Sequence, residues 1–205
     1  LQRQAELLLG AKGRLIADSG IALAGRSTIA EAGLQDGAVA TLLVKSHSVA
    51  IAASQAAFAL IRHCGSVVTW GDPQFGGDSS AVQEQLWNVR QVQAAERAFA
   101  AICHDGSVVS WGEHDSGGDS SAVREQLQNV RQVQATRRAF AAIRDDGSVV
   151  TWGQPDYGGD SSAVQTKLRK VRLVKGADHV FAAILEDGSV ATWGHPEHGG
   201  DSTSI

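Results

Sequence analysis

Histidine and serine are the side chains in this sequence best suited to catalysis, and their spacing gives little support for a catalytic centre. Five of the histidines occur singly at different positions: His104, His114, His179, His195 and His198. A helical zinc site needs two histidines four residues apart, and no such pair is present. No serine lies in the Gly-x-Ser-x-Gly pattern of a nucleophile elbow. The sequence therefore predicts no catalytic, metal-ligating or cofactor-binding residue, and a protein that is not an enzyme.

A Gly-Gly-Asp-Ser motif occurs four times and places equivalent aspartates at Asp78, Asp119, Asp160 and Asp201. Before a helix, such a glycine-rich turn could bind phosphate, but the aspartate would repel the anion and no Gly-Lys-Ser/Thr follows. The aspartates could instead hold cations, although their neighbours lack the ligand spacing of a calcium loop. The favoured interpretation is that these aspartates cap helices or form turns.

The composition argues against several classes of protein. There are 18 Lys and Arg residues against 22 Asp and Glu, for a formal net charge of -4, which predicts no nucleic-acid partner. No apolar run reaches the roughly 18 to 20 residues of a membrane span. These features favour a soluble, non-secreted protein. An organellar compartment and peripheral membrane association through a larger complex both stay open.

The chain contains no methionine, and Ile205 falls partway through a repeat. We therefore expect the sequence to be part of a longer polypeptide. It contains two cysteines, Cys64 and Cys103, for which we expect small buried or half-buried thiols rather than a disulfide.

One unit of 41 residues is repeated along most of the chain. Trp70, Trp111, Trp152 and Trp193 each stand in a (Val/Ala)-(Thr/Ser)-Trp-Gly motif at this constant spacing, which is typical of a repeat architecture. In the third copy, residues 130–135, 139–144 and 148–152 read as three strands. The dipeptide Asp146-Gly147 between the last two indicates a hairpin with a type I′ turn.

A short connecting helix is expected after each Gly-Gly-Asp-Ser motif. Val164, Leu168 and Val171 are spaced as one face of a helix, and Ser162 with Gln165 has the spacing of a capping box. Each unit is thus predicted to be a three-stranded antiparallel blade plus a short helix.

Residues 1–45 lie outside the repeat and form a small predicted α+β unit. A helix over residues 1–8, a strand at 14–16, a helical piece over 28–34 and a strand at 40–44 follow one another. This order resembles the later part of a ubiquitin-like domain. The resemblance implies that Ile16 and Val44 occupy positions like the apolar recognition patch of that family; as an alternative, both are core residues of a small sheet.

The repeat resembles that of the regulator of chromosome condensation (RCC1) family. The resemblance rests on Val-x-x-Val-x-Ala, Ala-Phe-Ala-Ala-Ile and Asp-Gly-Ser-Val-Val-Thr-Trp-Gly, followed by Tyr-Gly-Gly. It implies that residues 46–205 form part of a mainly β, RCC1-like propeller of about four compact blades, the last one incomplete. The Gly-Gly-Asp-Ser-Ser sequence departs from the Gly-Gln-Leu-Gly usual at that point of the family.

The positions that vary between copies predict where a partner binds. They fall in the loop after each tryptophan and in the turn before each second strand, and loops on a rigid scaffold commonly carry recognition. The alternative is that these loops are exposed and have no partner. The candidate partner-binding residues in the repeats are Phe75, Arg97, His114, Arg138, Asp156, Tyr157, His179 and His198.

The leading hypothesis is a non-catalytic scaffold that holds a protein partner on the variable loops. The RCC1-like and ubiquitin-like resemblances imply a rival role as a regulatory adaptor of a small GTPase or of the ubiquitin pathway. Near-identical repeats of this kind also resemble proteins of unicellular photosynthetic protists. This second resemblance implies an accessory structural subunit of a large assembly, even a photosynthetic one.

Overall fold

A computed structural model describes residues 13–17, 40–44 and 49–201 of the chain. The chain divides into two compact units, Leu1–Ser48 and Val49–Ile205. In the first unit, strand β1 (Gly13–Ala17) pairs antiparallel with β2 (Ala40–Val44). Both strands lie where the sequence predicts them. The helical segments predicted in this unit lie outside the described residues, so its ubiquitin-like character stays a prediction.

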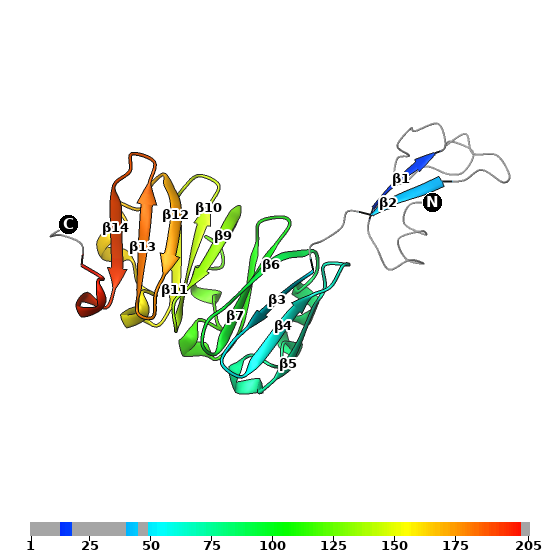
Figure 1. The fold of residues 1–205 in the computed structure, drawn as a ribbon, viewed down its shortest axis with the longest axis horizontal. Helices are drawn as coiled ribbons and strands as arrows, with labels where there is room; N and C mark the ends of the chain where they lie inside the picture. Colours follow the sequence, from blue (N-terminus) through cyan, green and yellow to red (C-terminus); the bar gives the residue numbers. More distant parts are fainter. Residues whose placement is uncertain (1–12, 18–39, 45–48, 202–205) are drawn as a thin grey trace. The chain divides into compact units, whose positions relative to one another are not determined.

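Residues 49–201 form four three-stranded antiparallel sheets that follow one another in sequence order (Figure 1). Blade 1 contains β3 (Ala50–Ala53), β4 (Ala57–Ile61) and β5 (Val67–Gly71). Blade 2 contains β6 (Val89–Ala94), β7 (Ala98–Cys103) and β8 (Val108–Gly112). Blade 3 contains β9 (Val130–Ala135), β10 (Ala139–Arg144) and β11 (Val149–Gly153), and blade 4 contains β12 (Val171–Gly176), β13 (Val180–Leu185) and β14 (Val190–Gly194).

The hairpin at Asp146-Gly147 is present, but its turn differs from the type I′ prediction. Gly147 N donates to Arg144 O (3.0 Å), and Arg144 N donates to Ser148 O (2.9 Å). Gly147 has a φ of +79°, whereas Asp146 is not among the described non-glycine residues with positive φ. This pattern is a type I turn followed by a left-handed glycine, which forms a bulge. Asp146 instead accepts a hydrogen bond from Ser148 N (2.9 Å).

The first blade makes the same turn with Cys64-Gly65, since Gly65 N donates to Arg62 O (2.8 Å). Both cysteines are free. Cys103 is buried as predicted, but Cys64 is exposed, so the prediction of a buried or half-buried thiol is wrong there. Cys64 lies within the turn itself, between Arg62 and Gly65.

The hydrophobic core lies in the junctions between consecutive blades. Between blades 2 and 3, Ile102 and Val108 pack against Phe140 and Trp152. The rings of Phe140 and Trp152 stack at 5.3 Å, and Trp152 Nε1 donates to the carbonyl of Gly117 at 3.0 Å. The indole therefore fills the junction and also satisfies a buried carbonyl of the preceding blade.

The connecting segments contain the short helices predicted for them, and these are 3-10 helices: η2 (Ser80–Gln85), η4 (Ser121–Val123) and η6 (Ser162–Val164). The capping box is wrong: Ser162 N donates to Asp160 Oδ1 (2.8 Å), while Gln165 donates to Val149 O (3.0 Å) and accepts from Ser161 Oγ (2.9 Å). Asp160 thus forms a tight turn just before η6, which is one of the two roles predicted for these aspartates.

A second set of 3-10 helices follows the tryptophans and carries the first group of variable residues. These are η1 (Pro73–Phe75), η3 (His114–Ser116), η5 (Pro155–Tyr157) and η7 (Pro196–His198). Each ends at a glycine in the left-handed conformation. The bend returns the chain across the end of the blade, so the variable residues are held by a turn of constant geometry.

Candidate functional site: the loop row

The two groups of variable residues lie next to each other in every blade where both are described. The second and third strands are antiparallel, with Ala98 opposite Gly112. The residues just before and just after this pair therefore meet, and Glu113 N donates to Arg97 O at 2.9 Å. We call the side chains gathered in this way the loop row: Phe75, Arg97, Glu113, Arg138, Gln154, Tyr157, His179, His195 and His198.

At the junction of blades 1 and 2, Arg97 is the central residue of the loop row. Its guanidinium lies 4.7 Å from the ring centre of Phe75, in a cation–π arrangement. It also forms an ion pair with Glu113 at 3.1 Å. The side chains of Arg97 and Glu113 are 32% and 35% exposed, so both are held in place yet remain accessible to a partner.

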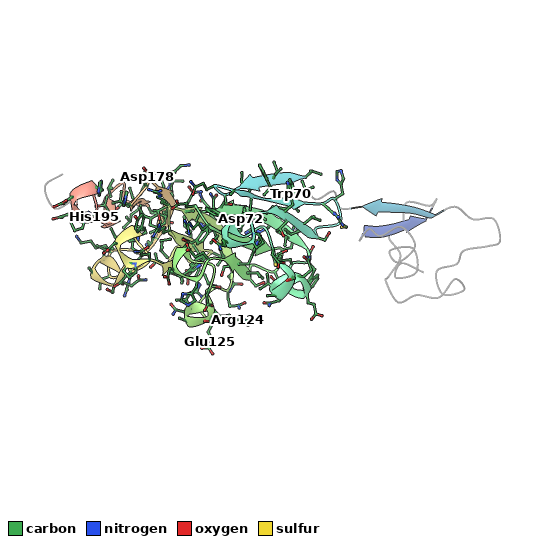
Figure 2. All side chains as sticks on the ribbon, turned by 90° about the horizontal axis from the view of Figure 1, so that it is seen from below. Trp70, Asp72, Arg124, Glu125, Asp178 and His195 are labelled. Atoms are coloured by element: carbon green, nitrogen blue, oxygen red, sulfur yellow. The ribbon has the colours of Figure 1, made fainter. Side chains whose placement is uncertain are left out.

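At the junction of blades 3 and 4, Tyr157 is the central residue. Arg138 lies 5.5 Å from its ring centre, and His179 stacks on it at 4.6 Å. His198 stacks on His179 at 4.4 Å, and His195 meets His198 edge-on at 4.7 Å. The result is a run of planar side chains that extends from blade 3 to blade 4, where Figure 2 labels His195.

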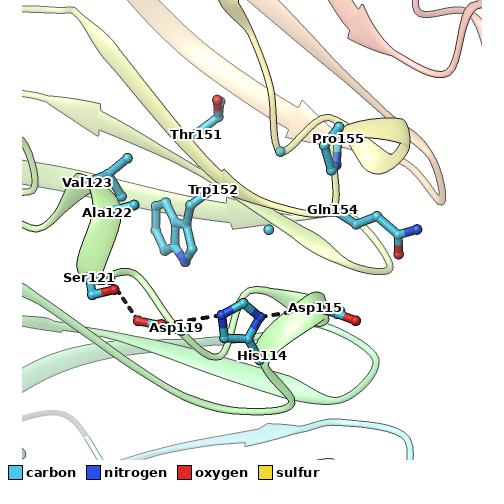
Figure 3. Close-up of a pocket in the computed structure, with 12 residues that line it drawn as sticks. His114, Asp115, Asp119, Ser121, Ala122, Val123, Thr151, Trp152, Gln154 and Pro155 are labelled. Atoms are coloured by element: carbon cyan, nitrogen blue, oxygen red, sulfur yellow. Dashed lines mark hydrogen bonds and ion pairs between the residues drawn. The ribbon is translucent and has the colours of Figure 1, made fainter.

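His114 is separate from these contacts and lines an open cleft of about 480 Å³ (Figure 3). Its Nδ1 lies 3.1 Å from Asp115 Oδ1 and its Nε2 lies 3.5 Å from Asp119 Oδ2. The histidine side chain is 79% exposed. Hydrogen bonds from Ser121, chiefly from its backbone N–H, hold the pKa of Asp119 below its ordinary value. Because these contacts are open to solvent, they contribute little to stability.

The other predicted residues are distributed as follows. Asp156 is exposed on η5 beside Tyr157. Ile16 lies on β1 opposite Thr41, and Val44 lies on β2 opposite Gly13. The structure thus brings Phe75 to Arg97, and Arg138, Tyr157, His179 and His198 to one another. It does not bring His114 into either group.

Glu113, Gln154 and His195 were absent from the predicted binding residues. Each lies 16 positions after the variable residue it contacts or adjoins: Arg138 Nη1 donates to Gln154 Oε1 at 3.4 Å, and His195 N donates to His179 O at 3.1 Å. The predicted hairpin could have revealed them, because the register of its two strands sets this spacing.

An ion pair links the turns that precede the second strands of blades 2 and 3. Arg137 Nε donates to Glu96 Oε2 at 2.8 Å, and Arg137 Nη2 donates to Glu96 Oε1 at 3.0 Å. The Glu96 side chain is only 10% exposed. These hydrogen bonds from Arg137 lower the pKa of Glu96. The paired charges fix the spacing of the two turns.

The described residues contain no group of three or more His, Cys, Asp or Glu side chains placed to hold a metal ion. Among the histidines of the loop row, His179 and His198 stack face to face, and His195 meets both of them edge-on. Within the same residues, no helix is long and apolar enough to cross a membrane.

Solved structures resemble this chain in fold. The crystal structure of human WBSCR16 aligns with a TM-score of 0.52 and 18% identity over 76% of this chain and 50% of that protein. Prp20p from Saccharomyces cerevisiae gives 0.51 and 17% over 78% and 48%. Yeast RCC1 (Prp20) bound to Kap60 gives 0.51 and 16% over 78% and 47%. The chain spans about half the length of each of these structures.

No family model and no curated protein matches the sequence. The fold is nevertheless that of an RCC1-like β-propeller, as the repeat predicts, with four described blades.

Proposed function

We propose that this chain is a non-catalytic scaffold that binds a protein partner through the loop row. The observation that carries the proposal is the separation of constant from variable residues. The constant residues, such as Phe140 and Trp152, are buried in the junctions. The variable residues are instead collected on adjoining turns and pack on one another, as Arg97 does on Phe75.

The chemistry of the loop row suits a protein surface. Aromatic rings and arginines provide most of the binding energy in protein interfaces, since they combine apolar area with directional hydrogen bonds. Arg97 and Arg138 are each 32% exposed and supported by a ring. Both guanidiniums are therefore ordered before a partner arrives, which reduces the entropy lost on binding.

A regulatory role toward a small GTPase or in the ubiquitin pathway is the second candidate. It is supported by the described binding of Prp20p to Gsp1p and histones and by the complex of yeast RCC1 with Kap60. Gsp1p, histones and Kap60 are partners of the yeast protein. For this chain they favour a protein as the class of ligand, while the binding role of Ile16 and Val44 stays a prediction.

Affinity capture with the 205-residue chain as bait tests the proposal. Arg97→Glu reverses a charge of the loop row and removes no core contact, and Phe75→Ala with Tyr157→Ala removes its phenylalanine and tyrosine rings. We expect both variants to lose the captured partner. Trp87→Ala is the matched control, because Trp87 is 54% exposed in a connecting segment.

Retention of every partner by both variants, with the fold confirmed by circular dichroism, would show that the loop row is not the binding surface. Among partners that are lost, a GTPase or ubiquitin-ligase component would favour the regulatory role. Recovery only within one complex of fixed stoichiometry would favour a structural subunit.

A further inference from the structure

The two outer faces of the four-blade array, on blade 1 and blade 4, carry exposed apolar side chains. On blade 1, Ile51, Phe58 and Trp70 are 61%, 42% and 43% exposed. On blade 4, Ile184 and Val190 are 42% and 51% exposed. We call these surfaces the leading face and the trailing face. Exposed clusters of this kind mark interaction surfaces.

Each exposed residue has counterparts that are buried at the internal junctions. Phe99, Phe140 and Phe181 correspond to Phe58 and are fully buried, and each packs on the preceding blade. Ile61, Ile102 and Ile143 correspond to Ile184 and are also fully buried. A trailing face therefore covers a leading face three times within the chain.

The polar groups of the two outer faces are complementary in the same way. At the internal junctions, the indoles of Trp111, Trp152 and Trp193 each donate to a glycine carbonyl of the preceding blade at 3.0 Å. Within the described part of the chain, Trp70 Nε1 has no such acceptor. Gly199 is the position equivalent to those acceptors, and apart from its two chain neighbours no other described residue has an atom within 4 Å of the point where its Cβ would be.

Backbone hydrogen bonds also link the turns that precede the second strands of successive blades. Gln55 N donates to Glu96 O (3.0 Å), Glu96 N to Arg137 O (2.8 Å), and Arg137 N to Asp178 O (3.0 Å). Among residues 49–201, this series of hydrogen bonds therefore ends on a donor at Asp178 N and an acceptor at Gln55 O. At each of these two positions, one outer face carries a hydrogen-bond donor and the other carries the matching acceptor.

From this complementarity we propose that a second copy of this chain covers the two faces. The trailing face of each copy packs on the leading face of the other, Trp70 Nε1 donates to Gly199 O across the contact, and Asp178 N donates to Gln55 O. Two copies of the 205-residue chain related by a two-fold axis make this contact twice and bring their eight described blades into one ring. This number is within the usual range of about four to eight blades for propellers.

Within residues 49–201, the contact between copies has one component fewer than an internal junction. Each internal junction also buries a leucine from the connecting segment, namely Leu86, Leu127 or Leu168. The described residues of the two outer faces include no equivalent leucine. We therefore expect association that depends on protein concentration.

Light scattering of the 205-residue chain across a concentration series tests the proposal. We expect a mass rising to twice 21.4 kDa. Ile51→Glu on the leading face and Val190→Glu on the trailing face each place a charge at an exposed position, so the blades should still fold. Each variant alone should remain at 21.4 kDa. Trp87→Glu changes an exposed aromatic residue outside both faces and should leave the doubled mass intact.

Mixing the two variants distinguishes this arrangement from a contact between like faces. Ile51→Glu retains its trailing face and Val190→Glu retains its leading face, so a mixture can form one intact junction and should recover a weak dimer. A chain that stays at 21.4 kDa at every concentration would overturn the proposal. So would a dimer that survives either single variant, or an assembly that grows beyond two copies.

Discussion

Blade 1 and blade 3 contain nearly the same strands but differ in what covers them. The Phe58–Trp70 and Phe140–Trp152 pairs both stack at 5.3 Å, with interplanar angles of 18° and 21°. Phe140 is fully buried, while Phe58 is 42% exposed. A blade therefore builds its aromatic pair by itself, and burial is supplied by the preceding blade. Stability in such an array is expected to come mainly from the junctions between neighbours.

The largest expected effect comes from removing the phenylalanine ring at an internal junction. Phe140→Ala should lower the free energy of unfolding by about 3 to 5 kcal/mol, because it removes a buried ring and leaves a cavity. Phe58→Ala should cost about 1 kcal/mol, since much of that ring already contacts water. Urea unfolding at low protein concentration measures both. Equal losses would mean that the two blades are covered alike.

The second comparison uses two glycines at equivalent positions. Gly117 and Gly199 have φ angles of +87° and +99°, so alanine is strained at either position by about 1 to 2 kcal/mol. A Cβ at Gly117 would also lie 2.7 Å from Phe140 Cδ2, whereas at Gly199 nothing lies within 4 Å. Gly117→Ala should therefore cost about 1 to 3 kcal/mol more than Gly199→Ala in the same unfolding assay. A difference near zero would show that Phe140 can move to make room for a methyl group at position 117.

The third comparison concerns the Glu96–Arg137 pair across the junction of blades 2 and 3. Glu96→Gln should lower the free energy of unfolding at pH 7 by about 1 kcal/mol, because a charge-assisted pair becomes neutral. Glu125→Gln, at the exposed position labelled in Figure 2, is the matched control and should change little.

The pH dependence of this effect has a defined sign. Since the pKa of Glu96 is lowered in the folded protein, the unfolded state binds more protons in the window between the two pKa values. The stabilisation is therefore complete above the unfolded pKa of about 4.3 and is lost as the pH falls through the lower folded pKa. Unfolding of the wild type and Glu96→Gln should converge on acidification. A constant difference down to low pH would contradict this assignment.

The repeat allowed most of the blade architecture to be predicted. The alternating apolar pattern places β9 at Val130–Ala135 and β10 at Ala139–Arg144, as the structure has them. The short connecting helix is present, but it is a 3-10 helix that ends at Val164, before Leu168. Val164 and Leu168 have helical spacing because both pack into the junction of blades 3 and 4. A hydrophobic pattern cannot determine the type and length of a helix in so short a segment.

The candidate site could be predicted by position but not by contact. Arg97 lies over Phe75 of the preceding blade. The residue equivalent to Phe75 beside Arg138 is Ser116, which is buried and donates to Glu113 Oε2 at 2.6 Å. With no ring available there, Arg138 lies over Tyr157 of its own blade. The ring that each arginine contacts therefore depends on the residue that the preceding repeat places beside it.

The smallest expected change in the free energy of unfolding is that of Cys64→Ser, in a comparison of the two cysteines in the hairpins of blades 1 and 2. A hydrogen bond with the Ser66 side chain lowers the pKa of the exposed Cys64 thiol, whereas burial raises the pKa of Cys103. Because the thiolate is the reactive form, a thiol reagent should label Cys64 in the native protein and Cys103 only with unfolding. Cys64→Ser should abolish the native labelling and leave the free energy of unfolding within about 0.5 kcal/mol of the wild type. Rapid labelling of Cys103 in native Cys64→Ser would instead mean that the junction of blades 1 and 2 opens without unfolding, and that the internal junctions differ less from the outer faces than their burial indicates.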